Sequence, residues 1–176
     1  MRQHVNPLSN YFHSFEPIPP LEKIFKFPYL PLHIDIGCGA GNFLFELAED
    51  NYEWNYIGIE IREKLVLNAK NKLENYPLDN LYFSFGNANH LINECIERLP
   101  KNILQSVSFN FPDPWYKKKH HKRRIVQSNL IYKLSQFMSK GTLIFIKSDV
   151  KELFQFMDFI ILRSSFYERI DNYKNK

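Results

Sequence analysis

The stretch Leu32-His-Ile-Asp-Ile-Gly-Cys-Gly-Ala-Gly41 decides the fold, because a short apolar run meets a cluster of glycines in it. The run over residues 32–36 predicts a buried strand. Residues 42–50 then place apolar side chains at helical spacing, so the glycines occupy a strand-to-helix turn. Glycine lets the backbone turn sharply and approach a ligand closely. The stretch is therefore typical of a strand–turn–helix unit beside a ligand-binding crevice.

Strand-like and helix-like segments continue to alternate after this unit. Four more strands are predicted, with a sixth candidate at the end: residues 55–60, 81–85, 106–111, 142–147 and 165–170. Helical spacing of apolar residues predicts the helices between and after them: residues 62–76, 88–99, 130–138 and 150–161. This order predicts an α/β fold, Rossmann-like, with a mostly parallel twisted sheet and helices on both faces.

The chain is long enough for one domain, with 176 residues of which 44% are hydrophobic. Four prolines among the first 20 residues predict an extended arm, residues 1–20, before a single domain, residues 21–176. No run approaches the ~20 apolar residues that cross a bilayer, and the N-terminus does not resemble a signal peptide. Two cysteines, Cys38 and Cys95, form no disulfide framework. We therefore expect a cytoplasmic protein without a membrane partner, either a monomer or a homodimer.

Positive charge is concentrated in one short segment. The net charge is +4, and it falls to −2 without the six positive residues of this segment: Lys117, Lys118, Lys119, Lys122, Arg123 and Arg124. A local cationic patch on an otherwise mildly acidic chain favours a polyanion docked at one place. The alternative is a solvated, charged start of the next helix. His120 and His121 have no cysteine or carboxylate at metal-ligand spacing, so no metal site is predicted.

In open parallel sheets, ligands bind beyond the carboxyl ends of the strands. Polar residues close each predicted strand there: Asp35 to Gly41, Glu60 with Arg62, Gly86 to Asn89, Asn110 to Asp113, and Ser148 with Asp149. A dinucleotide fingerprint would place its third glycine at position 42, which is Asn42, whereas here the third glycine is Gly41. The G-x-G-x-G spacing suits a loop beneath a nucleoside and an amino-acid moiety better than one around a pyrophosphate.

Three strand ends carry candidate ligand contacts. Glu60 ends the second strand, where a carboxylate can accept hydrogen bonds from both ribose hydroxyls or else cap the following helix. Asn87 and Ala88 are placed to meet an adenine, because an amide offers both a donor and an acceptor. Asp35 can hold a cationic end of the ligand, directly or by ordering the loop. Cys38 is interpreted as a small filler of the loop rather than as a nucleophile.

Residues 106–127 read SVSFNFPDPWYKKKHHKRRIVQ. They closely resemble the signature of the tRNA (guanine-N7)-methyltransferase family, in which a strand ends in F-P-D-P-W before a Lys/His/Arg run. The similarity extends from about His33 to Asp149 and includes DIGCGAGNF, IGIEIR and Lys147-Ser-Asp149. It implies a class I methyltransferase fold, S-adenosylmethionine as cofactor and tRNA as partner. It also implies methylation of guanine N7 in the tRNA variable loop, at tRNA position 46.

The resemblance further implies roles for individual residues. Cofactor binding is expected from Asp35, on the argument above, and from the residues at matched motif positions: Gly37, Glu60, Arg62, Asn87, Ala88 and Asp113. Asp113 corresponds to the catalytic aspartate of the family. Lys117 and Asp149 correspond to its substrate-binding positions.

Guanine N7 carries a lone pair and no proton, so its methylation requires no general base. Asp113 is therefore interpreted as an acceptor of hydrogen bonds from guanine N1–H or the N2 amine, which orients the base and favours its developing positive charge. The alternative is a turn residue between two prolines. Trp115 either stacks on a base or packs beneath the loop, and the cationic run 117–124 is expected to bind phosphates.

The end of the chain departs from the family pattern. Members typically continue through a Thr-x-x-Glu substrate motif and a final edge strand, whereas here Ser165-Phe-Tyr-Glu168 is the only near match, assigned to the sixth strand. A truncated C-terminal edge of the sheet is therefore expected. One alternative function is a non-catalytic S-adenosylmethionine- and RNA-binding protein of the same fold. A methyltransferase for adenine or cytosine amines is disfavoured by the F-P-D-P-W segment, and a nicotinamide-dependent oxidoreductase by the glycine spacing.

Overall fold

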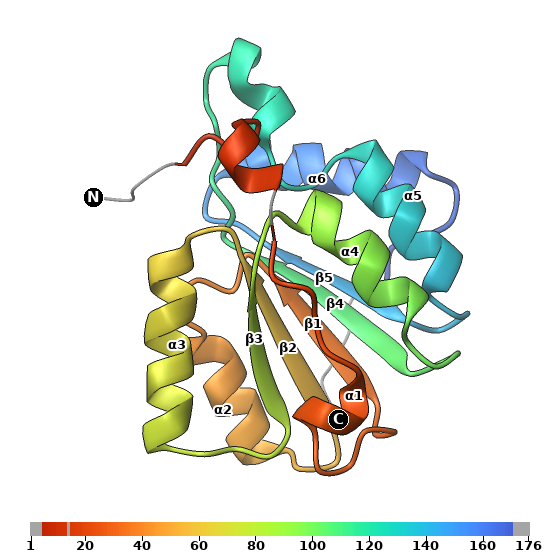
Figure 1. Ribbon diagram of the computed structural model, residues 1–176. Helices are drawn as coiled ribbons and strands as arrows, with labels where there is room; N and C mark the ends of the chain where they lie inside the picture. Colours follow the sequence, from red (N-terminus) through yellow and green to blue (C-terminus); the bar gives the residue numbers. More distant parts are fainter. Residues whose placement is uncertain (1–4, 14, 171–176) are drawn as a thin grey trace.

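The computed structural model describes residues 5–13 and 15–170 of the chain. Their centre is a sheet of five parallel strands in the order β3-β2-β1-β4-β5 (Figure 1). The strands are Leu32–Ile36 (β1), Asn55–Glu60 (β2), Leu81–Phe85 (β3), Leu104–Asn110 (β4) and Leu143–Lys147 (β5). The order reverses at β1, which pairs with β2 on one side and with β4 on the other. Such a switch point opens a crevice at the carboxyl ends of the strands.

Helices cover both faces of the sheet (Figure 1). The main ones are Asn42–Asp50 (α2), Glu63–Asn75 (α3), Ala88–Glu97 (α4), Ser128–Phe137 (α5) and Lys151–Arg163 (α6). α2 and α3 share one core with Tyr56 and Phe83, and α4, α5 and α6 share the other with Ile34 and Val107. Alternate strand residues point to opposite faces, so one sheet supplies both cores. Within the described residues, no helix has the length and apolar character needed to span a membrane.

These elements confirm the predicted α/β class with a parallel sheet and helices on both faces. β1, β2 and β3 have the predicted bounds, while β4 begins two residues before the predicted start and β5 one residue after it. The prediction of a sixth strand is wrong, because residues 165–170 form none. Ser165 has a left-handed φ of 60°, and the chain after it returns to α5, where the rings of Phe166 and Tyr132 lie 6.0 Å apart.

The N-terminal segment crosses the carboxyl end of β3 before it enters the core. It contains one turn of 3₁₀ helix, Asn10–His13 (η1), where only extended chain was predicted. The Glu16 N–H donates to the carbonyl of Phe85, and the Ser84 hydroxyl donates to the carbonyl of Glu16. Ile18 is buried, and the short helix Leu21–Ile24 (α1) follows it. These contacts fix the segment against the sheet.

Candidate active site

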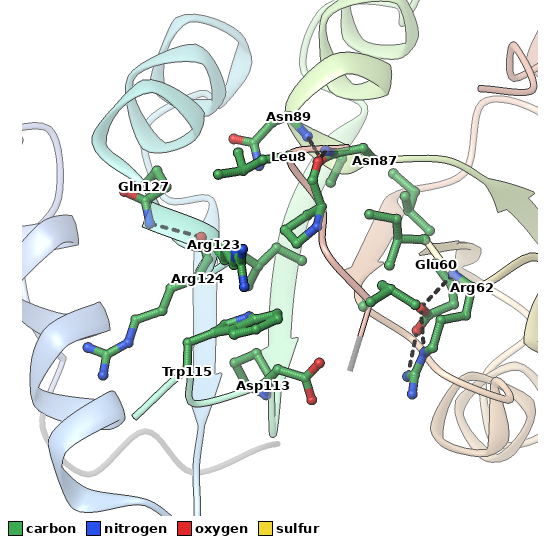
Figure 2. A pocket seen from close by; sticks show the side chains of 18 of the residues that line it. Leu8, Glu60, Arg62, Asn87, Asn89, Asp113, Trp115, Arg123, Arg124 and Gln127 are labelled. Carbon is green, nitrogen blue, oxygen red and sulfur yellow. Dashed lines mark hydrogen bonds and ion pairs between the residues drawn. The ribbon is translucent and has the colours of Figure 1, made fainter. Parts of the chain in front are cut away.

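A cavity of about 400 Å³ opens where β1, β2, β3 and β4 end. Its size lies in the range of small-molecule sites, about 300–1,000 Å³. Six residues singled out from the sequence line it: Gly37, Glu60, Arg62, Asn87, Ala88 and Asp113. In Figure 2, Glu60 and Arg62 lie on one side and Trp115 and Arg123 on the other, with Asp113 between them. The crevice that the strand order predicts is therefore present and contains most of the predicted site.

The glycine loop beneath this cavity depends on backbone conformations that other residues disfavour. Gly37, Gly39 and Gly41 have φ angles of 85°, 61° and 77°. A Cβ atom on Gly41 would lie 2.4 Å from the ring of Phe83, so the close packing of loop and sheet also requires glycine there. A Cβ atom on Gly39 would meet nothing within 4 Å. The N–H of Gly39 instead donates to Glu60 at 2.9 Å, which ties the loop to the end of β2.

Glu60 is 2% exposed, and its carboxylate is fully hydrogen-bonded. Oε1 accepts from the backbone N–H and the Nε of Arg62 at 2.9 and 3.0 Å, while Oε2 accepts from Gly39 and from Nη2 of Arg62. These four bonds fill the acceptor positions of a carboxylate. The side-chain hydrogen bonds from Arg62 to Glu60 raise the pKa of Arg62, and the negative charge of Asp113 acts in the same direction. The Arg62 guanidinium thus uses acceptor positions that ribose hydroxyls would need.

Asn87 and Ala88 lie at the junction of β3 and α4. The Asn87 side chain is buried, its Oδ1 accepts the N–H of Asn89 at 3.1 Å, and its Nδ2 donates to the carbonyl of Pro7 at 3.0 Å. Both ends of the amide are therefore bonded within the chain. Pro7 lines the cavity together with Val5 and Leu8, so the N-terminal segment forms part of its wall. Nothing in the sequence pattern of residues 5–8 indicated this.

The segment from Phe111 to Trp115 carries Asp113 at the mouth of the cavity. Phe111 and Trp115 have φ angles of 48° and 46°, which cost non-glycine residues roughly 1–2 kcal/mol each. Strained residues of this kind cluster at functional sites. The N–H of Phe111 donates to the carbonyl of Lys147 at 2.9 Å, which ties the segment to the end of β5. The carboxylate of Asp113 points across the cavity toward Glu60 and Arg62 (Figure 2).

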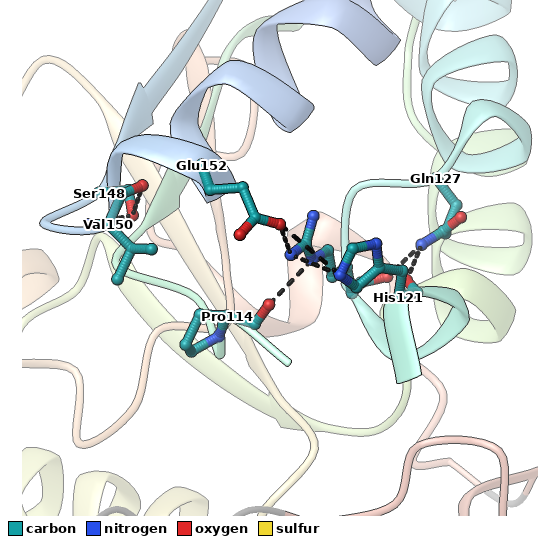
Figure 3. Close-up of polar contacts among 7 residues, drawn as sticks. Pro114, His121, Gln127, Ser148, Val150 and Glu152 are labelled. Atoms are coloured by element: carbon teal, nitrogen blue, oxygen red, sulfur yellow. Dashed lines mark hydrogen bonds and ion pairs between the residues drawn. The ribbon is translucent and has the colours of Figure 1, made fainter. Parts of the chain in front are cut away.

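Arg124 connects this segment to α6 through the carbonyl of Pro114 and the carboxylate of Glu152, both labelled in Figure 3. Its side chain is 3% exposed, donates to the carbonyl of Pro114 at 2.8 Å, and pairs with Glu152 of α6 at 2.9 Å. Its guanidinium also lies 4.6 Å from the ring centroid of Phe156. The expectation that every cation of the run 117–124 binds phosphate is therefore wrong for Arg124, because its charge is buried and already paired.

The other members of the cationic run differ in their exposure. Four lysines are exposed, in or directly before the 3₁₀ helix Lys118–Arg123 (η2): Lys117, Lys118, Lys119 and Lys122. Arg123 is partly buried, with its guanidinium 5.0 Å from the ring centroid of Trp115, and both residues line the cavity. The free cationic surface is thus a lysine cluster beside the cavity mouth.

Three predicted site residues do not line the cavity. Asp35 is 2% exposed and lies on β1, where its Oδ1 accepts hydrogen bonds from Ser108 and Asn110. Lys117 and Asp149 are exposed and follow β4 and β5, at the same edge of the sheet as the cavity. The predicted site residues therefore occupy three locations: Asp35 is buried in the sheet, six residues line the cavity, and Lys117 and Asp149 lie on the outer rim.

Comparison with known proteins identifies the family of this chain. Residues 30–176 match the family described as "Putative methyltransferase". The tRNA (guanine-N(7)-)-methyltransferase of Prochlorococcus marinus subsp. pastoris is 58% identical over 170 residues, which cover 97% of this chain and 81% of the relative. The chain belongs to the tRNA (guanine-N7)-methyltransferase family. A second family member, from Synechococcus elongatus, is 45% identical over 153 residues, which cover 87% of this chain and 72% of that relative.

Solved structures of more distant proteins share the fold of this family member. A precorrin-6y C5,15-methyltransferase from Geobacter metallireducens superimposes with a TM-score of 0.57 at 11% identity, over 77% of this chain and 63% of that one. A phosphoethanolamine N-methyltransferase from Haemonchus contortus gives 0.55 at 10% identity, over 82% and 35%. At these identities the likeness concerns the fold alone, and it agrees with the class I architecture inferred for the family.

Proposed function

We propose that the chain transfers a methyl group from S-adenosylmethionine to N7 of a guanosine in the variable loop of tRNA, at tRNA position 46. The observation that carries this proposal is one cavity at the switch point of the sheet, which brings the glycine loop, Glu60 and Asp113 together. The lysine cluster lies beside its mouth, and the sequence relatives carry this activity in their names. The protein would act on tRNA in the cytoplasm, as a monomer or a homodimer.

The polar groups in and beneath the cavity fit a nucleoside carrying an amino acid. Glu60 is a buried carboxylate at the end of β2, where it can accept bonds from ribose hydroxyls once Arg62 releases its side-chain bonds. Asn87 and Ala88 supply a wall for the adenine, and the Asn87 amide holds the segment at Pro7 against that wall. Gly37 lets the loop pass close to the ligand. Asp35 supplies negative charge beneath the loop.

Bound S-adenosylmethionine supplies a sulfonium methyl group, and its transfer to N7 yields S-adenosylhomocysteine and a cationic guanine. Because N7 bears no proton, the residues have to orient the base and stabilise positive charge rather than remove a proton. Asp113 would do both, by accepting hydrogen bonds from N1–H or the N2 amine. Lys117 and Asp149, on the rim of the crevice, would bind the substrate outside the cavity. The remaining exposed lysines would bind tRNA phosphates.

The function is tested with the purified chain, labelled S-adenosylmethionine and an unmodified tRNA transcript. The methylated base is then identified after nuclease digestion, and its position is mapped along the tRNA. Label on N7 of guanine in the variable loop supports the proposal. Label on an exocyclic amine would identify a different methyltransferase, and cofactor binding without transfer would identify the non-catalytic alternative.

The role of Asp113 is tested with Asp113→Asn, which keeps the shape and removes the charge. We expect kcat to fall by about 10²–10³, the scale of losing one preorganised electrostatic group. Asp79→Asn is the matched control, because Asp79 is an exposed aspartate that pairs only with Lys26 at 3.5 Å among the described ion pairs. A kcat for Asp113→Asn within a few-fold of the unmutated protein would refute the role.

A further inference from the structure

A row of polar side chains crosses the two central strands on one face of the sheet: His33 and Asp35 on β1, and Ser106, Ser108 and Asn110 on β4. Members of the row on one strand are two residues apart and so share a face. The strand register places His33 beside Ser106 and Asp35 beside Ser108. The row faces α2, where the ring of Phe43 meets the ring of His33 at 6.3 Å.

The row forms one connected chain of hydrogen bonds. His33 Nδ1 lies 2.7 Å from the hydroxyl of Ser106, and Nε2 lies 2.9 Å from the hydroxyl of Ser108. Ser108 donates to Oδ1 of Asp35 at 2.5 Å, and the amide of Asn110 donates to the same oxygen at 3.0 Å. His33, Asp35 and both serines are at most 5% exposed. Water therefore has little access to these hydrogen bonds.

The connectivity fixes the positions of the protons. The hydroxyl of Ser108 has one proton, and it is donated to the Asp35 carboxylate. Ser108 can then only accept from His33, so the imidazole must carry its proton on Nε2. Nδ1 is left as an acceptor for the hydroxyl of Ser106. Protonation of Asp35 would reverse these directions, because a neutral carboxyl could donate to Ser108.

Burying this row of polar side chains costs free energy of folding, since buried polar groups are tolerated only when their hydrogen bonds are satisfied. Central parallel strands usually carry apolar residues on both faces. The charged member of the row is Asp35, which directly precedes Ile36 and the glycine loop. We propose that His33 is a positioning residue of the methyl-donor site, which acts through Ser108 to hold Asp35 anionic and in one orientation beneath the glycine loop. The inference rests on the cofactor role proposed for Asp35.

Other ionisable groups surround the row. Besides burial, the negative charge of Glu60, at the end of β2, raises the pKa of Asp35. Cys38 lies in the glycine loop that follows Asp35. Tyr56 of β2 packs against His33, and the ammonium of Lys147 of β5 lies 5.8 Å from the Phe43 ring. Burial raises the pKa of Asp35 to about 6, against the bonds from Ser108 and Asn110, and lowers the pKa of His33 to about 4. Both values give an anionic Asp35 and a neutral His33 at neutral pH.

The proton arrangement is tested directly in the unmutated chain. Nitrogen-15 NMR of the imidazoles distinguishes the two neutral tautomers, and the His33 signals are identified by their loss in His33→Gln. We expect a neutral ring with its proton on Nε2 at neutral pH. A ring protonated on Nδ1, or one that is charged, would overturn the proposal, and the tautomer itself is read in the unmutated chain.

The link to the cofactor is tested by calorimetric titration with S-adenosylmethionine at neutral pH. His33→Phe keeps a ring but removes both hydrogen bonds, and we expect roughly tenfold weaker binding. His33→Gln restores a donor to Ser108 and should bind within about threefold of the unmutated chain. Ser106→Ala is the matched control, because it removes a bond to His33 that does not lead to Asp35. Equal losses in His33→Phe and Ser106→Ala would indicate a merely structural role.

A double-mutant cycle with Asp35→Asn separates this proposal from the proposed function. If His33 acts through Asp35, the Asp35→Asn/His33→Phe protein should bind the cofactor no more weakly than Asp35→Asn alone. Additive losses would overturn the proposal. Normal cofactor binding by Asp35→Asn in a chain that methylates guanine N7 would overturn it too, and would leave the proposed function intact.

Discussion

Gly39 and Gly41 share a left-handed backbone but have different surroundings. Only at Gly41 would a Cβ atom collide with the core, at 2.4 Å from the Phe83 ring. The G-x-G-x-G spacing is visible in the sequence, but this difference between its members is not, because Phe83 lies more than forty residues away in the chain. The same is true of Phe111 and Trp115, whose left-handed φ angles follow from how the loop is tied at both ends.

Because only Gly41 packs against Phe83, alanine should destabilise the protein more at Gly41 than at Gly39. Gly39→Ala should lower the free energy of unfolding by about 1–2 kcal/mol, the cost of a left-handed alanine. Gly41→Ala should cost roughly 1–3 kcal/mol more, because the added methyl group overpacks the core at Phe83. Urea unfolding of both variants measures the difference. Equal costs would show that Phe83 moves aside freely.

The buried histidine predicts a pH dependence of stability. Its pKa is lowered from 6.5 to about 4, so the unfolded chain binds more protons between these values. The stability contributed by neutral His33 is therefore complete above pH 6.5 and lost as the pH falls toward 4. The free energy of unfolding of the unmutated chain minus that of His33→Gln should rise over this window, by about 3.4 kcal/mol at most, since one pKa unit corresponds to about 1.36 kcal/mol.

Asp35 has the opposite sign, because its pKa is raised to about 6 and its stabilising contribution is lost as the pH rises from 3.8 through 6. Both proteins retain Asp35, so to a first approximation its contribution cancels in the difference. Urea unfolding at a series of pH values gives the difference curve. A curve that stays flat between pH 4 and 6.5 would contradict the buried, neutral state of His33.

At the scale of elements, Arg124 joins three parts of the molecule that are separate in the sequence. It connects the loop at Pro114, the end of η2 and helix α6 through Glu152 (Figure 3). The sequence pattern grouped Arg124 with the phosphate-binding cations, since Arg124 ends a run of basic residues. The buried position became clear only from the packing of α6 against this segment.

The two residues of the Arg124–Glu152 ion pair should differ strongly in how much their replacement destabilises the protein. Arg124→Ala should lower the free energy of unfolding by roughly 2–4 kcal/mol, because it leaves the carbonyl of Pro114 without its donor and opens space against Phe156. Glu152→Ala should lower it by less, because the side chain of Glu152 is 60% exposed and water screens its charge. Denaturant unfolding compares them, and an equal cost would show that the ion pair dominates.

The strands illustrate what periodicity can and cannot reveal about elements. Apolar runs bounded by turn residues located five strands, since each strand packs apolar side chains against the helices. The prediction of the sixth strand failed because its apolar residues make a different contact: Phe166 packs against Tyr132 of α5, and Tyr167 donates to Met138, directly after α5. The helix-like start of the N-terminal segment was missed as well, because a single 3₁₀ turn leaves no periodic pattern.

At the scale of the whole molecule, charge is unevenly distributed. The lysine cluster lies at the edge of the sheet where the cavity opens, while the chain outside residues 117–124 has a net charge of −2. A polyanion is therefore attracted to the cavity edge in preference to other surfaces. The sequence alone located the cationic run 117–124, and the structure showed that its exposed cations are the four lysines.

Removal of this charge should weaken tRNA binding in a salt-dependent way. The triple variant Lys117→Gln, Lys118→Gln, Lys119→Gln should reduce the slope of log affinity against log salt concentration by roughly 2, at about 0.7–0.9 per phosphate contact. The control carries the same change at three exposed lysines elsewhere: Lys23, Lys101 and Lys140. Binding is measured over a range of salt concentrations. An unchanged slope, or an equal change in the control, would contradict docking through this cluster.

The sequence by itself determined the order of strands and helices, the glycine loop, the acid at the end of β2 and the F-P-D-P-W segment with its cations. All of these are local patterns, fixed by side-chain period and short-range chemistry. Tertiary structure alone decided that Asp35 accepts from Ser108 next to His33, that Gly39 and Arg62 together fill the acceptor positions of Glu60, and that the N-terminal segment lines the cavity. These features join residues far apart in the chain, so no local pattern encodes them.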